Sequence, residues 1–376
     1  MNEQAKIGIL GGGQLGRMLL QPAIDLNLQL HFLDPDPEAP CASCSPFFTV
    51  GKLTDYDTVY QFAKNLDIIS IEIENVNTEA LAQLTKEGKQ VYPQPEIIKI
   101  IQDKRLQKQF YQNHQIPTSP FVLIDEPAAL EQYKDWLPAV LKLGKEGYDG
   151  KGVMLLHNEQ DFKSAFVAPS VLERKIDIDK ELAVIVARNP QGEIQAFPAV
   201  EMVFNPRYNL IDYQLSPARI SEATAQKAQQ LATKVIETFA MIGILAIEMF
   251  LDTEGNLWVN EVAPRPHNSG HQSIEANYTS QFEQHLRAIN HMPLGNTDLR
   301  EQAAMVNLIG EEGYQGIARY QGWEKISTLK GVKIHLYGKK YTKPGRKMGH
   351  ITILENNLQA LKEKVQYIKE NFKVIA

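Results

Sequence analysis

The sequence predicts an α/β protein of three lobes: an N-terminal lobe with a parallel sheet, a small central α/β lobe, and a C-terminal lobe whose sheet is largely antiparallel. Three observations predict this fold class. Strands alternate with helices over the first ~100 residues, a proline-broken segment follows at Ile116–Pro120, and the later strands read as an antiparallel sheet. A length of 376 residues is enough for two or three domains.

The first lobe, predicted over residues 1–102, is Rossmann-like. Lys6–Leu10 is a short apolar run that ends in glycines, and Gln14–Asp25 carries apolar residues at helical spacing. Leu28–Leu33 and Asp67–Ile73 read as the second and third strands. Strands that alternate with helices imply βαβ units, and such units build a parallel sheet.

The central lobe is predicted over residues 103–176 and acts as a lid. It begins with a helix from Asp103 (DKRLQKQFYQNH) and has a second helix near Asp161–Phe166. Its predicted strands are Ala139–Lys142, Gly152–Leu156 and Val171–Glu173.

The C-terminal lobe is predicted over residues 177–376. Helices near Ser221–Phe239 and Tyr278–His291 flank its sheet, and the tail from Tyr337 forms a small C-terminal subdomain with a strand and a last helix. The predicted strands of the sheet are Glu181–Arg188, Ile194–Val200, Ile244–Leu251 and Leu257–Val262.

The bulk properties exclude several classes of function. The chain has 39 Lys and Arg against 45 Asp and Glu, a net charge of −6, whereas nucleic-acid binders usually carry a concentrated basic face. No run of about 18 apolar residues is present to span a membrane. The N-terminus, MNEQAKIGIL, lacks the basic region and cleavage site of a signal peptide. These observations predict a cytoplasmic enzyme that binds neither nucleic acid nor membrane.

The first glycine-rich loop favours a phosphate ligand. Gly11–Gly16 reads GGGQLG between a predicted strand and helix, and Asp34 follows 18 residues after Gly16. This is the dinucleotide-binding pattern, so an NAD-dependent oxidoreductase is one interpretation. However, glycines and a helix N-terminus favour any anion, so the loop indicates a phosphate more firmly than it indicates NAD.

Two further features suit a nucleoside triphosphate. Lys142 ends an apolar strand and is followed by the glycine-rich segment 144–152, where a lysine and backbone N–H groups can hold phosphates. Glu173 ends the next strand, and Glu181 begins another eight residues later. The extended backbone at 173–176 can bind an adenine edge, and a carboxylate just beyond can accept hydrogen bonds from ribose hydroxyls.

Two acidic residues on apolar strands indicate a metal site. Glu248 (AIEMF) and Glu261 (WVNEV) lie on strands joined by the turn DTEGN, and their spacing of 13 residues can place them opposite each other in a hairpin. A buried carboxylate without a partner is costly. Mg²⁺ prefers one or two carboxylates together with phosphate oxygens, and so it is the natural partner. A pair of salt-bridged acids is the alternative.

With these residues in place, the chain resembles the ATP-grasp superfamily, and more narrowly the 5-(carboxyamino)imidazole ribonucleotide synthases of purine biosynthesis. The resemblance covers essentially the whole chain. Its blocks are GGGQLGRML at 11–19, EIENV at 72–76, GYDGKG at 147–152, NEVAPRPHNSGH at 260–271 and PGRKMGH at 344–350. The last two blocks are far more specific than a glycine loop.

The resemblance implies an ATP-grasp fold and an ATP-dependent ligase that forms a C–N bond. Bicarbonate and ATP would give carboxyphosphate, which the exocyclic amine of 5-aminoimidazole ribonucleotide captures; the family's habit is a homodimer. Glu248 and Glu261 match the Mg²⁺ ligands. The ATP-contacting positions that the resemblance implies are Lys104, Lys142, Gly147, Tyr148, Asp149, Gly150, Lys151, Gly152, Val153, Glu173, Arg174, Lys175, Ile176, Glu181, Asn260 and Glu261.

The resemblance also implies a substrate site and a reaction centre. Catalytic roles fall on Asp149, Arg265, His267, Lys339 and Arg346, with Asp149 and His267 as competing candidates for the base that removes the amine proton. The substrate-binding positions are Gly13, Gln14, Leu15, Glu74, Tyr148, Arg265, His267, Asn268, Ser269, Lys339 and Arg346. Another ATP-grasp ligase, such as a formate-dependent glycinamide ribonucleotide transformylase, is an alternative.

Overall fold

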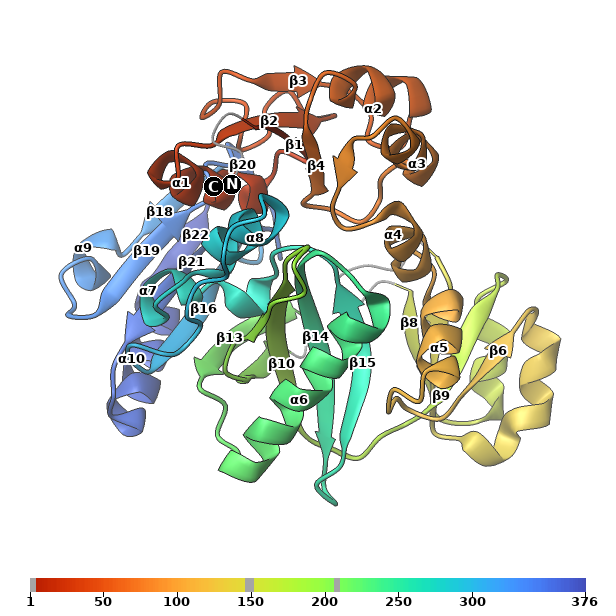
Figure 1. Cartoon of the computed structure of the whole chain (residues 1–376). Coiled ribbons are helices and arrows are strands. Elements are labelled where there is room, and N and C mark those ends of the chain that lie inside the picture. Colours follow the sequence, from red (N-terminus) through yellow and green to blue (C-terminus); the bar gives the residue numbers. More distant parts are fainter. Residues whose placement is uncertain (1–4, 146–151, 206–209) are drawn as a thin grey trace.

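The computed structural model describes residues 5–145, 152–205 and 210–376. In Figure 1 the N-terminal lobe lies at the top, a small lobe lies at the lower right, and the remainder of the chain forms the rest of the body. The predicted α/β class, with a parallel N-terminal sheet and antiparallel sheets beyond it, is confirmed. The division at residues 102/103 and 176/177 stays a prediction.

The N-terminal sheet is parallel and has the strand order β3-β2-β1-β4-β5. Its two faces are both apolar: Ile7 and Ile9 pack in one core cluster, and Leu10 packs in another on the opposite side. Burial on both faces explains why these strands are continuous apolar runs. The elements are β1 (Lys6–Leu10), α1 (Gln14–Asp25), β2 (Gln29–Asp34), β3 (Phe48–Val50), α2 (Tyr56–Ala63), β4 (Ile68–Ile71), α3 (Thr78–Lys86), β5 (Gln90–Val91) and α4 (Pro95–Ile101).

The small lobe has an antiparallel four-stranded sheet of order β6-β9-β7-β8. Helix α5 (Lys104–Asn113) leads into it, and Asp103 caps the helix by accepting a hydrogen bond from the Arg105 N–H. The other elements are β6 (Phe121–Ile124), the 3₁₀ segment η1 (Pro127–Trp136), β7 (Ala139–Leu143), β8 (Val153–Leu156), the 3₁₀ segment η2 (Glu159–Ser164) and β9 (Ser170–Arg174).

The largest sheet is antiparallel and runs β15-β14-β10-β12-β13-β16-β21-β19, with β11 paired to β10. Helix α6 (Glu222–Phe239) packs its apolar face against this sheet, and the resulting core contains Ala232, Val235 and Ile236. The strands are β10 (Ile178–Arg188), β11 (Ile194–Ala196), β12 (Val200–Asn205), β13 (Leu210–Ser216), β14 (Gly243–Asp252), β15 (Leu257–Ala263), β16 (Ala303–Ile309), β19 (Val332–Leu336) and β21 (Lys347–Leu354).

The remaining elements surround this sheet. Two small ribbons pair β17 (Gly316–Ile317) with β20 (Tyr341–Thr342), and β18 (Arg319–Gln321) with β22 (Lys373–Ile375). The helices are η3 (Asn268–Gly270), α7 (Ser273–Ala276), α8 (Gln281–Ile289), α9 (Trp323–Ile326) and α10 (Leu358–Asn371). Across 5–145, 152–205 and 210–376, no helix combines the length and the apolar character that crossing a bilayer requires.

Helix α8 joins two lobes. Although it follows the large sheet in the sequence, its Phe282, Leu286 and Ile289 belong to the same core cluster as Ile7 and Ile9 of the N-terminal sheet. The helix also packs on β10 and β14 of the large sheet. The N-terminal core is therefore completed by a helix from the C-terminal part of the chain.

Candidate active site

The two predicted metal ligands face each other. Glu248 of β14 pairs directly with Glu261 of β15 in the antiparallel register, and the register shifts immediately afterwards so that Met249 pairs with Val259. Asn260 is thus an extra residue in β15, a β-bulge. The predicted hairpin geometry is confirmed.

The carboxylates of this pair have different electrostatic surroundings. Lys104, the first residue of α5, lies 2.5 Å from Glu261 Oε2, and its ammonium lowers the pKa of Glu261 to about 2 against the opposing effect of burial. Burial raises the pKa of Glu248, and the neighbouring Glu261 and Glu181 raise it further. Glu261 therefore has a cationic partner in Lys104, while Glu248 lies in a region of negative electrostatic potential.

Glu181 belongs to the same face of the sheet. Glu248 pairs with Ala183 of β10, so Glu181, two residues earlier on that strand, lies diagonally across from it. Burial raises the pKa of Glu181 to about 7. Three neighbouring strands therefore bring acidic side chains to one surface, which attracts a cation or a hydrogen-bond donor.

A buried ion cluster lies beside the acidic pair. Lys142 of β7 donates to Asn260 Oδ1 over 2.7 Å and lies 3.0 Å from Glu173 Oε1. Lys108 of α5 lies 3.1 Å from Glu173 Oε2. Burial alone would raise the pKa of Glu173, but Lys142 and Lys108 outweigh it and lower this pKa to about 2.

Sequence reasoning missed Lys108. The signal that could have found it is its spacing of four residues from Lys104 on the same helix, because such residues lie on one helical face. Sequence reasoning also predicted Glu173 among the ATP-contacting residues. The side chain of Glu173 is only 3% exposed, and its carboxylate forms ion pairs with the ammonium groups of two lysines.

The loop after β15 carries the predicted reaction-centre residues. Arg265 Nε lies 2.9 Å from Glu74 Oε1, which connects this loop to the N-terminal lobe. His267 Nε2 lies 3.4 Å from Glu248 Oε1, and its Nδ1 lies 2.9 Å from Ser269 Oγ. These contacts bring predicted substrate and metal positions together.

Two amide side chains fix this loop. Gln281 of α8 accepts from the His267 N–H over 2.8 Å and donates to the His267 carbonyl over 2.7 Å. Asn268 and Asn307 of β16 exchange amide hydrogen bonds of 2.9 and 3.0 Å. The loop is therefore held from both sides, which orients the His267 ring.

Lys339 and Arg346 lie on the C-terminal segment. Lys339 donates to the Lys347 carbonyl over 2.8 Å, and Arg346 donates to the Tyr341 carbonyl over 2.9 Å. Neither hydrogen bond reaches the acidic pair, so the binding of a substrate by Lys339 and Arg346 stays a prediction.

The first glycine loop is occupied by acidic side chains of the protein itself. Glu72 Oε1 accepts from the Gly13 N–H over 2.6 Å, and its Oε2 accepts from the Gly16 N–H. Asp34 Oδ2 accepts from the Gly12 N–H over 2.7 Å. A phosphate at Gly13 would have to compete with Glu72. Asp34, the acid that an NAD site would use for a ribose, is already engaged with the loop. The structure therefore gives no support to the NAD interpretation.

Five predicted residues, Gly147, Tyr148, Asp149, Gly150 and Lys151, lie outside the described residues. Gly152 has φ +78°, and its carbonyl accepts from the Leu143 N–H over 2.8 Å; Val153 pairs with Lys142. Two predicted ATP-contacting residues at the end of β9 have partners within the protein: the guanidinium of Arg174, the last residue of the strand, lies 4.8 Å from the Trp136 ring centre, and Lys175 lies 3.6 Å from Asp177.

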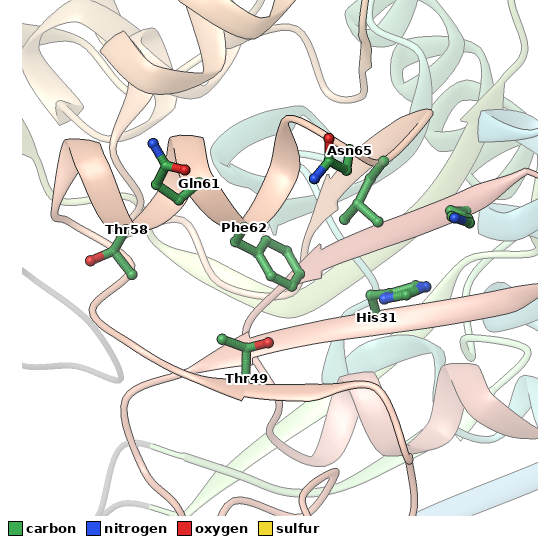
Figure 2. A pocket seen from close by; sticks show the side chains of 8 residues that line it. His31, Thr49, Thr58, Gln61, Phe62 and Asn65 are labelled. Atoms are coloured by element: carbon green, nitrogen blue, oxygen red, sulfur yellow. The ribbon is translucent and has the colours of Figure 1, made fainter.

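A separate cavity of about 490 Å³ lies in the N-terminal lobe (Figure 2). Thr58, Gln61 and Phe62 of α2 line it together with His31 of β2 and Thr49 of β3. It contains none of the predicted site residues, and we assign it no part in the chemistry.

Models of known families match three successive segments of the chain. A ribonucleotide synthetase preATP-grasp domain matches residues 4–102, an ATP-grasp domain matches 109–282, and a phosphoribosylaminoimidazole carboxylase C-terminal domain matches 303–364. Together with the acidic pair and its flanking lysines, these matches define an ATP-grasp ligase.

Relatives that match nearly the whole chain show which family of ATP-grasp ligases it belongs to. The N5-carboxyaminoimidazole ribonucleotide synthase of Bacillus subtilis is 37% identical over 357 residues, which cover 93% of this chain and 92% of that protein. The crystal structure of N5-carboxyaminoimidazole ribonucleotide synthetase from Thermotoga maritima has 40% identity and a TM-score of 0.92, covering 99% and 100% of the two chains. The chain belongs to the N5-carboxyaminoimidazole ribonucleotide synthase family.

Related structures contain bound ADP or ATP. The N5-carboxyaminoimidazole synthase of Aspergillus clavatus, in complex with ADP and 5-aminoimidazole ribonucleotide, has 33% identity and a TM-score of 0.89, covering 98% of this chain and 99% of that one.

Proposed function

We propose that the chain carboxylates the exocyclic amine of 5-aminoimidazole ribonucleotide with ATP and bicarbonate in purine biosynthesis, giving 5-(carboxyamino)imidazole ribonucleotide, ADP and phosphate. The observation that carries this function is the registered pair Glu248–Glu261, flanked by Lys104 and Lys142, in a chain of this family. Opposed carboxylates and lysines are what a triphosphate and its cation need.

The chemistry has two steps. A bicarbonate oxygen attacks the γ-phosphorus of ATP, the bond to the β-phosphate oxygen breaks, and ADP leaves. The amine nitrogen then attacks the carboxyl carbon of carboxyphosphate, phosphate leaves, and the amine loses a proton. Splitting the reaction in this way converts an unreactive carboxylate into an acyl phosphate with a good leaving group.

The acidic pair fits Mg²⁺. Within the described part of the chain, no three His, Cys, Asp or Glu side chains form a metal-binding group, so the protein supplies two carboxylates and the nucleotide would complete the shell with phosphate oxygens. When bound, Mg²⁺ would neutralise phosphate charge and align the γ-phosphoryl group.

The nucleotide and substrate would meet between the lobes. Lys104, Lys142 and Asn260 would hold phosphates, and Glu181 would accept from a ribose hydroxyl. Arg265, with its planar fork, would bind bicarbonate and carboxyphosphate. His267, whose ring contacts Ser269 Oγ and whose backbone is held by Gln281, would take the amine proton, with Asp149 as the competing base.

The proposal is tested by phosphate release. With Mg-ATP, addition of bicarbonate and 5-aminoimidazole ribonucleotide is expected to stimulate release, whereas formate and glycinamide ribonucleotide are expected to leave it unchanged. Stimulation by the second pair alone would replace the proposal with the formate-dependent alternative. The predicted homodimer is tested separately by the molar mass of the protein in solution, measured by light scattering after size-exclusion chromatography.

A further inference from the structure

Lys108 has three oxygen atoms around its ammonium group. Its Nζ donates to Thr118 Oγ1 over 2.6 Å and to Ser119 Oγ over 3.1 Å, and it forms an ion pair of 3.1 Å with Glu173 Oε2. The Ser119 hydroxyl also donates to Glu173 Oε2. Lys108 is thus an internal cation whose partners all belong to the protein.

Exposure decreases along the three lysines of the site. The exposed fraction of the side chain is 20% for Lys104, 10% for Lys142 and 3% for Lys108. Lys108 is therefore the most deeply buried of the three and the least accessible to a substrate.

Glu173 divides its two oxygens between these lysines. Oε2 faces Lys108, and Oε1 faces Lys142, whose Nζ also donates to Asn260. Lys142 is therefore paired with one carboxylate and one neutral amide oxygen among the described residues. Two lysines and one carboxylate give this cluster a net charge of +1. Without Lys108, Glu173 and Lys142 would form a neutral ion pair.

We propose that Lys108 is a positioning residue that neutralises Glu173 and so leaves the positive charge of Lys142 for the phosphates of ATP. The inference rests on the proposed function, in which Lys142 holds phosphates. In a buried site each unit of net charge has a large effect on an anion a few ångströms away, because the surroundings screen it weakly. Lys108 thereby favours nucleotide binding by balancing the charge of Glu173, without a contact of its own to the phosphates.

Replacement of Lys108 tests this role. Lys108→Met is expected to raise the KM for ATP about tenfold or more, while kcat at saturating ATP stays within about threefold, because binding is lost and the reacting groups remain. The same change at an exposed lysine of α4, Lys99→Met, is expected to leave both constants unchanged. An unchanged KM in Lys108→Met would overturn the proposal.

A double variant separates the charge of Lys108 from its packing. If Lys108 acts by balancing Glu173, the KM for ATP of Lys108→Met/Glu173→Gln is expected to stay within about threefold of the wild-type value, because removal of both charges leaves the cluster at +1. A KM about tenfold or more above that of wild type in the double variant would refute the proposal. This comparison stands even if Lys108→Met alone does not fold, since the double variant contains no uncompensated buried carboxylate.

Failure of the proposed function would be visible separately. If wild-type protein releases no phosphate with bicarbonate and 5-aminoimidazole ribonucleotide, the same variants are compared by calorimetric titration with Mg-ATP. The Kd values are expected to follow the order predicted for KM. Equal Kd values in wild type and Lys108→Met would reject the role of Lys108, whatever the second substrate is.

Discussion

Asn260 allows one strand to present two side chains to the same site. In a regular strand, neighbouring residues point to opposite faces of the sheet. The bulge adds Asn260 beside Glu261, so Asn260 accepts from Lys142 while Glu261 accepts from Lys104. The bulge thus allows two adjacent residues of strand β15 to bind two lysines of the small lobe.

The two carboxylates of the acidic pair differ in their neighbours. The Lys104 ammonium lowers the pKa of Glu261, whereas burial and two other acids raise the pKa of Glu248.

Neutralising Glu261 is expected to abolish turnover. Glu261→Gln removes one anionic ligand and the partner of Lys104, so both cation and phosphate binding weaken. We expect phosphate release in the presence of both substrates to fall by at least about 100-fold, the size of effect seen when one electrostatic contact to a transition state is removed. The matched control is Glu254→Gln, an exposed acid in the turn of the same hairpin. Near-normal turnover in Glu261→Gln would contradict the metal assignment.

The sequence was informative about the residues that act locally. A spacing of 13 across a turn was enough to predict that Glu248 and Glu261 face each other, because the hairpin is local. The role of Glu72 could not be predicted, since its contact with Gly13 joins residues 59 positions apart. The ion pair of Lys108 with Glu173 could not be predicted for the same reason, because the small sheet brings Glu173 to Lys108.

At the scale of elements, α8 is the joint between the N-terminal and large sheets. Its apolar side packs into the core of the N-terminal sheet, and His285 Nε2 lies 2.9 Å from Ser70 Oγ of β4. The His285 ring is fully buried, and its Nδ1 has no hydrogen-bond partner among the described residues. A proton on this ring would be costly because a buried charge would lack solvation.

His285 is expected to make the fold acid-sensitive. Burial lowers its pKa to about 4 from 6.5, so the unfolded chain takes up the proton first as pH falls. The stabilising contribution is complete above pH 6.5 and is lost as the pH falls towards 4. By linkage, about 2 kcal/mol is lost between pH 7.5 and 5.0.

The measurement is urea unfolding of wild type and His285→Gln at both pH values. The difference in unfolding free energy between the two proteins is expected to shrink by about 2 kcal/mol at pH 5.0, because the variant lacks the titrating ring. His157→Gln, at an exposed histidine, should show no such change. An equal difference at the two pH values would show that His285 does not control this sensitivity.

Elements with strong periodicity were predictable, and short ones were not. The strand Lys6–Leu10 and the helix Gln14–Asp25 form with the predicted bounds. Strands β3 and β5 were missed because three and two residues are too few to show an alternation of apolar and polar side chains. The helix expected near Asp161–Phe166 is a six-residue 3₁₀ segment, Glu159–Ser164. A capping box formed by Asn158 begins this segment at its N-terminus. Short segments take their form from tertiary packing rather than local preference.

At the scale of the whole molecule, the candidate site lies where three lobes meet. Lys104–Glu261 and Lys142–Asn260 join the small lobe to the large sheet, and Arg265–Glu74 joins the large sheet to the N-terminal lobe. Each partner of these pairs comes from a different sheet region. This convergence was implied by family resemblance, because spacing along the chain cannot show which lobes approach each other.

A ligand bound between lobes should stabilise the whole protein. Mg-ATP at roughly 100-fold above its Kd is expected to add about 2.7 kcal/mol to the stability, because it binds the folded state alone. The measurement is the melting temperature with Mg-ATP, with ATP and EDTA, and with NADH. We expect a clear rise with Mg-ATP and a smaller rise once EDTA removes the cation that we propose binds the acidic pair. We expect none with NADH, since Asp34 and Glu72 already occupy the first glycine loop. A rise with NADH that equals that of Mg-ATP would show that the first loop, and not the Glu248–Glu261 pair, is the nucleotide site.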